Sequence, residues 1–278
     1  MKQTGIISRS SLAMMLVCSL GTGVASAGPV SYWAANGFTD FTKPDNGSNG
    51  EDWVGNNGFV GPGYGGQAFD AEYLYYKQVG NTLSIGLQTG FDLSDGYQKH
   101  GNLHYYAGDL ALSFDNHATM GAGSGTTFEY GIDFGFKTRG YSGRHHSLTD
   151  SSTAGLIDMG TGTGTDAAGV YSVTGWSNDV VAAHHDSDPF AMNDGSLVTG
   201  LIDNLYGMEG DSHYRVVSFD LAALGLSGDL GIDAHWTMNC GNDSVDGHFS
   251  ASVPEPTTLP LLGLGLLGLI AGRKKLAK

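Results

Sequence analysis

The sequence predicts an all-β protein built as a single antiparallel β-sandwich or jelly-roll-like domain. Apolar residues alternate with polar or small residues in several short runs, which is the period of a strand that buries one face. Glycine accounts for 45 of the 278 residues, against a usual share of roughly 7%, and many glycines follow Asn, Asp or Ser in pairs that favour tight turns. Before residue 253 no segment has a clear helical period, so we expect strands to supply the core.

The first 27 residues have the pattern of a signal peptide. Two basic residues precede an apolar stretch, and Ala25 and Ala27 place small side chains where signal peptidase cleaves. We therefore expect export through the Sec translocon and a mature chain that begins at Gly28.

Alternating apolar residues mark the clearest strands, at residues 83–87, 110–114 and 128–136. Several strands at this spacing are typical of a sandwich or jelly roll. Short helical turns are expected only at residues 180–184 and 220–226.

The alternation continues late in the chain, at Val216 and then at Ile232, Ala234, Trp236 and Met238. The last four share one strand face, because side chains two residues apart lie on the same side of a strand. We expect the large Trp236 side chain to fill space between two sheets.

Two stretches have the composition of long surface loops, residues 36–66 and 147–169. Both are rich in Gly, Asn, Ser and Thr and contain few apolar residues. Tight turns are expected at four glycine pairs: Asn36-Gly37, Asn57-Gly58, Asp95-Gly96 and Asp194-Gly195.

The C-terminus combines a short motif, an apolar run and a basic cluster. Val253 is followed by Pro254, Glu255 and Pro256, and the prolines favour an extended, protease-accessible hinge because they cannot continue a helix or a strand ladder. Residues 257–272 are apolar, and as a helix they would span about 24 Å, somewhat less than a hydrocarbon core of roughly 30 Å. The run ends in Arg273, Lys274 and Lys275, and such a basic cluster prefers the cytoplasmic side of a membrane.

This tail resembles the PEP-CTERM sorting signal, which an exosortase recognises and processes in bacteria that have an outer membrane and an exopolysaccharide system. The resemblance implies transient anchoring in the inner membrane of a Gram-negative bacterium and cleavage near the Pro-Glu-Pro motif. It also implies delivery to the outer surface or to the exopolysaccharide matrix of a biofilm.

Internal strands carry a second resemblance, to a set of exosortase-dependent surface proteins. The segments that carry it are residues 69–76, 83–93, 108–115 and 129–133, with residues 235–243 similar to the closing strand of those proteins. The early strands are also similar to carbohydrate-binding and DOMON-type β-sandwiches, which implies a ligand role without assigning ligand residues.

The mature chain is expected to be strongly acidic. Two of the 13 Lys and Arg residues lie before Gly28 and four after residue 272, so seven remain against 28 acidic residues, a net charge of −21. Such a surface repels nucleic acid and anionic lipid. It suits a soluble extracellular protein or one that collects divalent cations.

Cysteine chemistry is limited to Cys240, because the other cysteine lies in the predicted signal peptide. An intramolecular disulfide is therefore excluded in the mature chain, and a buried, inert thiol is the preferred interpretation over intermolecular pairing or metal binding. His235 precedes Cys240 by five residues, so on one strand the two side chains face opposite sides.

Two Asp-rich segments are candidate calcium loops. Asp186, Asp188 and Asp194 lie in one, and Asp92 and Asp95 lie in the other. Calcium needs six to eight oxygen ligands, which closely spaced carboxylates can supply. Asx-turns explain the same residues without a metal, and neither segment matches an EF-hand.

Catalytic signals are weak. The acidic pairs Glu51-Asp52 and Asp70/Glu72 have the residue types of a glycosidase, but the sequence does not set their separation. The adjacent histidines, at 145–146 and 184–185, are interpreted as solvated loop residues. We therefore expect no enzymatic activity.

Together these features predict a signal peptide over residues 1–27, a β-sandwich over 28–252 and a sorting signal over 253–278. The expected function is that of a non-enzymatic surface or matrix protein, sorted by an exosortase and associated with exopolysaccharide. The alternatives are a calcium-assisted carbohydrate-binding module and, third, a glycan-active enzyme. No cofactor other than calcium is expected.

Overall fold

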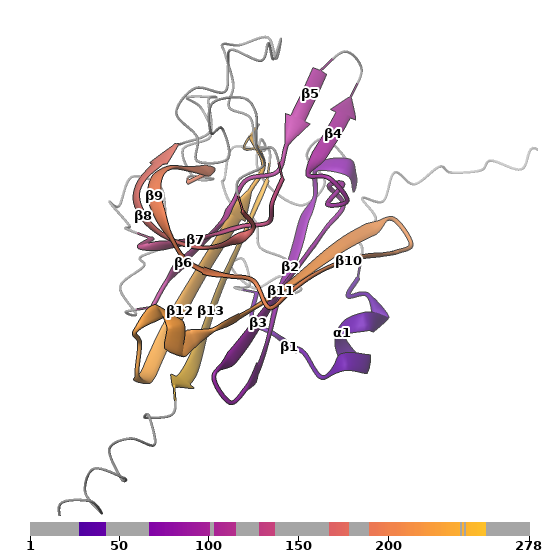
Figure 1. Cartoon of the computed structure of the whole chain (residues 1–278). Helices are drawn as coiled ribbons and strands as arrows, with labels where there is room; N and C mark the ends of the chain where they lie inside the picture. The colour runs from indigo at the N-terminus through magenta and orange to yellow at the C-terminus, as the bar shows by residue number, and fades with distance from the viewer. Residues whose placement is uncertain are drawn as a thin grey trace, which may run out of the picture.

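The computed structural model describes residues 28–42, 67–100, 103–114, 128–136, 167–177, 189–239, 241 and 243–253. Its strands form two antiparallel sheets packed on a shared hydrophobic core (Figure 1). This confirms the predicted β-sandwich. Within the described ranges no helix has the length and apolar character needed to cross a membrane.

Sheet A has five strands in the order β1-β2-β3-β11-β10. Their bounds are Thr39–Asp40 (β1), Ala71–Val79 (β2), Thr82–Thr89 (β3), Ser212–Asp220 (β11) and Asp203–Glu209 (β10). Gly80 and Asn81 form the two-residue turn between β2 and β3, and Gly80 has φ +60°, which favours glycine.

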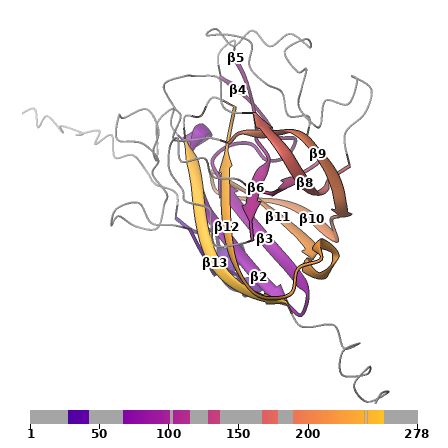
Figure 2. The same cartoon turned by 90° about the vertical axis from the view of Figure 1, so that its left-hand side faces the viewer.

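Sheet B has six strands in the order β13-β12-β6-β7-β8-β9 (Figure 2). Their bounds are Ser244–Val253 (β13), Gly228–Thr237 (β12), Leu110–Ser113 (β6), Tyr130–Asp133 (β7), Gly169–Ser177 (β8) and Ala191–Gly200 (β9). The segment similar to a closing strand, residues 235–243, covers the end of β12 and stops just before β13, because β12 ends at Thr237 and β13 begins at Ser244. Strands β4 (Tyr97–His100) and β5 (Leu103–Tyr106) form a separate hairpin at one end of the sandwich.

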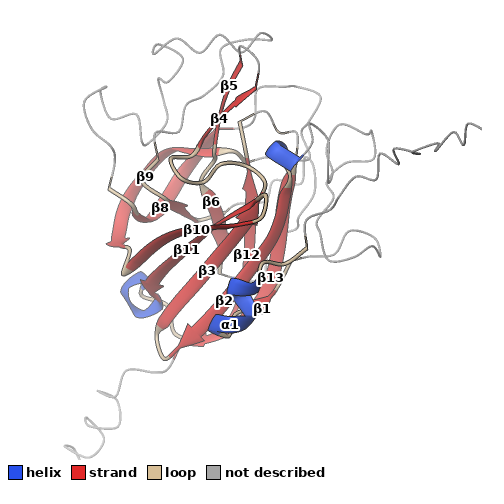
Figure 3. Ribbon diagram, turned by 90° about the vertical axis from the view of Figure 1, so that its right-hand side faces the viewer, coloured by secondary structure: helices blue, strands red, loops and turns tan. Residues whose placement is uncertain are grey.

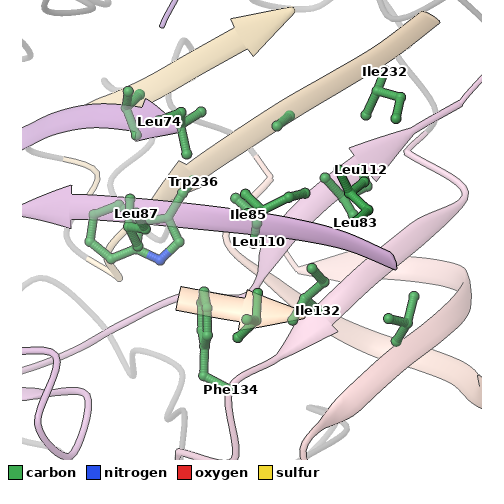
Figure 4. Packing of buried hydrophobic residues seen from close by; sticks show 14 of the residues in the cluster. Leu74, Leu83, Ile85, Leu87, Leu110, Leu112, Ile132, Phe134, Ile232 and Trp236 are labelled. Carbon is green, nitrogen blue, oxygen red and sulfur yellow. The ribbon is translucent and has the colours of Figure 1, made fainter. Parts of the chain in front are cut away.

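The core between the sheets contains most of the residues that the alternating pattern selected. Val216 instead belongs to a separate cluster with Trp33 and Tyr75 on the outer face of sheet A. Leu83, Ile85 and Leu87 on β3 are at most 1% exposed and point towards side chains of sheet B (Figure 4). The four apolar residues of β12 and its end are 0% exposed: Ile232, Ala234, Trp236 and Met238. The Trp236 indole Nε1 donates to the Gly108 carbonyl at 3.0 Å, so the ring is both buried and hydrogen-bonded. The predicted location of Trp236 between two sheets is confirmed.

Within the residues that the structure describes, three short helices interrupt the strands: α1 (Ser31–Asn36), η1 (Gln67–Phe69) and η5 (Leu221–Leu224). The turn expected within residues 220–226 is confirmed as η5, where the Asp220 carboxylate accepts from the Ala222 amide at 2.9 Å. α1 was not expected, because six residues are too few to establish a helical period. β1 also corrects the sequence interpretation, since it lies in the predicted 36–66 loop.

The expected turn at Asp194-Gly195 is wrong. Both residues lie inside β9, where they pair with Gly175 and Val173 of β8, beside shifts in the strand register. A glycine within a strand often marks such an irregularity. Asp194 and Gly195 therefore lie in an irregular part of the β8–β9 ladder and not in a hairpin turn. The Asp95-Gly96 turn is confirmed, with Gly96 at φ +68°.

Candidate functional site

The end of β13 is where the folded domain meets the predicted sorting signal. β13 pairs with β12 as far as the partners Gly228 and Val253, and the Val253 side chain is 3% exposed within the core. Gln78 Nε2 donates to the Ser252 carbonyl at 2.5 Å, which ties this strand end to β2. The chain therefore leaves the sandwich at the end that also carries the β2–β3 turn (Figure 1).

Val253 was assigned from the sequence to the sorting signal, and the structure makes it the last residue of β13. The other predicted processing residues lie outside the described residues: Ala25, Ala27, Pro254, Glu255, Pro256, Arg273, Lys274 and Lys275. The proposed membrane helix at 257–272 lies outside them too.

A groove of about 490 Å³ lies on the outer face of sheet A, lined in part by residues of α1. Figure 3 shows α1 lying on this face of the sheet. Its floor includes Ser84 of β3 with Val216 and Ser218 of β11. Ser84 and Ser218 are partners in the ladder, and their hydroxyl oxygens are 2.7 Å apart in a hydrogen bond. This volume falls within the roughly 300–1,000 Å³ typical of small-molecule sites.

The walls of the groove combine aromatic, aliphatic and polar side chains. Tyr32 and Phe38 line it from α1 and the residues after it, and Asp203 and Leu205 line it from the edge strand β10. Burial, then the charge of Tyr214 and then that of Asp203, raise the pKa of the Tyr32 phenol. Asp203 and Tyr32 are therefore near enough to interact electrostatically.

The groove depends on the docking of α1, whose buried residue is Trp33. Trp33 is 2% exposed, stacks on Tyr75 with ring centroids 4.4 Å apart, and covers Gly86. A Cβ at position 86 would lie 2.4 Å from the Trp33 ring, so only glycine permits this approach. At the first residue of α1, the Ser31 amide donates to the Glu209 carboxylate at 3.1 Å.

The buried side-chain amide of Gln88 connects α1 to the carboxylate of Glu72 in sheet A. Gln88 Oε1 accepts from the Trp33 indole at 2.7 Å and from the Val30 amide at 3.1 Å, while Gln88 Nε2 donates to Glu72 at 2.5 Å. Gln67 and Ser212 also donate to Glu72, at 2.6 and 2.9 Å. Glu72 therefore fixes the orientation of the Gln88 amide, which in turn holds α1.

Glu72 belongs to a group of buried acidic residues that also includes Asp70 and Asp243. Burial raises the pKa of Glu72 to about 7, although its three hydrogen-bond donors oppose the shift and nearby Asp70 adds to it. Asp243 is 0% exposed; burial and the charge of Asp70 raise its pKa well above the usual range. The amides of Ala71 and Ser244 donate to the Asp243 carboxyl at 2.8 and 2.9 Å.

The Asp70/Glu72 pair considered for glycosidic hydrolysis lies in the interior, since the two residues are 2% and 0% exposed. A glycosidase needs two carboxyl groups that reach the glycosidic bond of a bound substrate. The carboxyl groups of this pair are buried inside the fold, so a substrate would not reach them. The second acidic pair, at 51–52, lies outside the described residues, as do the adjacent histidines.

Two histidines pair with aspartates across β12 and β13. His235 Nδ1 lies 2.7 Å from Asp246, and His248 Nδ1 lies 2.7 Å from Asp233. These pairs connect directly opposite residues of the ladder, so they stabilise strand pairing.

The candidate calcium residues form no metal-binding cluster in the part of the chain that the structure covers. Asp92 accepts from the Ser94 amide at 2.8 Å and the Ser94 hydroxyl at 2.6 Å, which is an Asx-turn, and Asp194 is exposed on β9. Asp95 is exposed in the adjacent turn. Among the described residues, no cluster of three or more His, Cys, Asp or Glu side chains has an arrangement that could hold a metal. Asp186, Asp188 and Cys240 lie outside these residues, so the calcium site at 186–194 and the buried thiol stay predictions.

Sequence reasoning did not find the residues of the groove. Tyr32 and Trp33 offered one signal, since two adjacent aromatic residues follow the predicted cleavage site closely. Asp203 and Leu205 offered none, because their meeting with α1 depends on how distant segments pack.

Comparison with protein-family models found a match at the C-terminus. Residues 252–275 match the family model of the PEP-CTERM protein-sorting motif, which covers the Pro-Glu-Pro motif and the basic residues as far as Lys275. Comparisons with curated proteins and with solved structures gave no match.

Proposed function

Because the chain carries a PEP-CTERM sorting motif, which implies exosortase processing and export to the cell surface, we propose that it is a non-enzymatic surface or matrix protein. It associates with exopolysaccharide on the outside of a Gram-negative bacterium. The observation that carries the proposal is the direct junction of the motif with a packed sandwich at Val253. The sorting motif therefore directs one folded β domain to the cell surface.

The junction also supports a limit on where the exosortase cuts. A protease needs an extended, unpaired backbone, and the β12–β13 ladder includes residues up to Val253. The cut therefore falls on the C-terminal side of Val253, and the released domain keeps its last strand.

Intact-mass measurement of the surface-released protein tests this step. The expected product begins at or near Gly28, ends at or after Val253 and lacks residues 259–278. Glu255→Ala or Pro256→Ala should leave an uncut, membrane-retained form, whereas Thr258→Ala beside the motif should be released normally. Released protein that retains the basic tail, or that ends before Val253, contradicts the proposal.

Association with exopolysaccharide needs a separate test. The mature protein should sediment with the extracellular polysaccharide of a producing strain and remain in the soluble fraction of a strain unable to make that polymer. Equal recovery in both soluble fractions would contradict the association while leaving the processing step intact.

A second candidate function, carbohydrate binding, is supported by the groove on sheet A. Its aromatic and aliphatic walls over a floor with hydroxyl groups have the chemistry of a small-ligand site. In this candidate function, a role for calcium in carbohydrate binding depends only on the loop predicted at residues 186–194.

A further inference from the structure

We propose that the groove between α1 and β10 binds an uncharged saccharide unit, and that through it the protein contacts exopolysaccharide. This inference rests on the proposed association with exopolysaccharide and assigns that association to one face of sheet A.

The apolar part of the groove matches the C–H face of a sugar ring. Leu205 is 44% exposed and Val79 is 66% exposed, although both are large aliphatic residues. Tyr32 adds an aromatic ring that is half-buried against Tyr214, with centroids 4.6 Å apart. A rigid aromatic ring supported from behind presents contact area with little loss of side-chain entropy on binding.

The polar part of the groove matches the hydroxyl groups of the same ring. The paired hydroxyls of Ser84 and Ser218 can each donate or accept, and the Asp203 carboxylate on the opposite wall accepts. Vicinal hydroxyls of a pyranose need both kinds of partner within one small site. Hydroxyls on the floor with an acceptor on the wall therefore favour a polyhydroxylated ligand over a purely apolar one.

Charge selects an uncharged saccharide. The cation that lines the groove, Lys77, donates to the Asn36 carbonyl at 2.8 Å and lies 5.8 Å from the centroid of the Phe38 ring. It is thus engaged with α1 and its flanking residues. Asp203 and the net charge of −21 expected for the mature chain repel uronates and other anionic sugars.

The binding test uses mature protein released by the producing strain. The probes are cellohexaose, laminarihexaose, mannohexaose and the strain's own purified exopolysaccharide, with hexagalacturonate as the anionic comparison, and isothermal titration calorimetry gives affinities. We expect binding of the purified exopolysaccharide and of at least one uncharged hexasaccharide, and none of hexagalacturonate. Asp203→Ala and Leu205→Ala should each weaken that binding by about tenfold.

Asp229→Ala provides the matched control. Asp229 is an exposed carboxylate on β12 of sheet B, so its removal changes the charge as Asp203→Ala does but leaves the groove intact. Asp203 and Leu205 are themselves exposed, and unchanged melting temperatures would verify that their variants fold. The control should bind as the wild type does.

Three results would overturn the assignment of the groove: wild-type protein that binds no uncharged probe, a preference for hexagalacturonate, or equal binding by wild type and both groove variants. The sedimentation experiment separates this failure from that of the proposed function. If Asp203→Ala and Leu205→Ala protein still sediments with exopolysaccharide as the wild type does, association stands and the groove is not its site. If the wild type does not sediment with the polymer, the association itself fails.

Discussion

The two faces of sheet A are stabilised in different ways. On the inner face, Leu83, Ile85 and Leu87 pack against sheet B in a hydrophobic core. On the outer face, a six-residue helix is held by Trp33, by the Gln88 amide and by a buried Glu72 carboxyl. The inner contacts are non-directional and depend on apolar area, whereas the outer contacts depend on individual atoms.

This contrast teaches where the two faces tolerate change. An apolar core accepts substitutions that conserve volume, because its contribution to the free energy of unfolding depends on the shape and the buried area of its side chains. The outer face has little such freedom, because Gly86 must lack a Cβ and Gln88 must present its oxygen to Trp33 and its nitrogen to Glu72. The candidate groove belongs to the outer face, so its shape depends on these specific partners.

Removing Trp236 from the inner core should produce the largest effect. Trp236→Ala deletes a fully buried ring and should lower the free energy of unfolding by about 3–5 kcal/mol. Chemical denaturation of wild type and variant measures the difference. Val79→Ala, at a site that is 66% exposed, provides a control with a small expected change. If the Trp236 variant and the wild type had equal free energies of unfolding, packing on the inner face would not be a main source of stability.

Glu72 makes the outer face sensitive to pH. The pKa of Glu72 is near 4.5 when unfolded and about 7 when folded, so the folded state binds its proton more tightly. This contribution is fully present below pH ~4.5 and is lost as the pH rises through about 7, amounting to about 3 kcal/mol. Asp243 acts in the same direction, because burial raises its pKa as well.

The free energy of unfolding against pH measures this effect, with Glu72→Gln as the test variant. The variant should lose part of the downward slope between about pH 4.5 and 7. The slope is the readout because the new amide N–H group would replace one carboxylate oxygen. It would then face either the Gln88 donor or the Gln67 and Ser212 donors, and so lower stability at every pH. Asp229→Asn on the surface should keep the slope. A Glu72→Gln curve parallel to that of the wild type would mean that Glu72 does not titrate in this range.

Gly86→Ala should cost less and act on the outer face alone. The new methyl group would meet the Trp33 ring, so α1 must shift, and overpacking of this kind costs about 1–3 kcal/mol. Denaturation measures the cost, and increased acrylamide quenching of tryptophan fluorescence should accompany it as Trp33 becomes exposed.

Gly200→Ala is the matched control, because a Cβ there meets no atom within 4 Å. In a Trp33→Ala background, Gly86→Ala should lose most of its cost, since the clash is removed. Additive costs in the double variant would place the strain somewhere other than the Trp33 contact.

The sequence by itself determined the features that depend on local pattern. Period-two alternation identified β3, β6 and the buried face of β12, and the Asp220 cap coincided with a predicted turn. The sorting motif was readable because it is linear: Pro-Glu-Pro, an apolar run and a basic cluster act through their order along the chain.

Tertiary structure alone decided the features that join distant segments. α1 is too short to have a period, Asp194-Gly195 became part of a strand through its pairing with β8, and Glu72 became buried only when Gln67, Gln88 and Ser212 surrounded it. The groove requires residues near positions 32, 84 and 203 to meet on one sheet face. A local pattern reports which face of an element is apolar, but the burial of a charge and the shape of a groove depend on what covers that face.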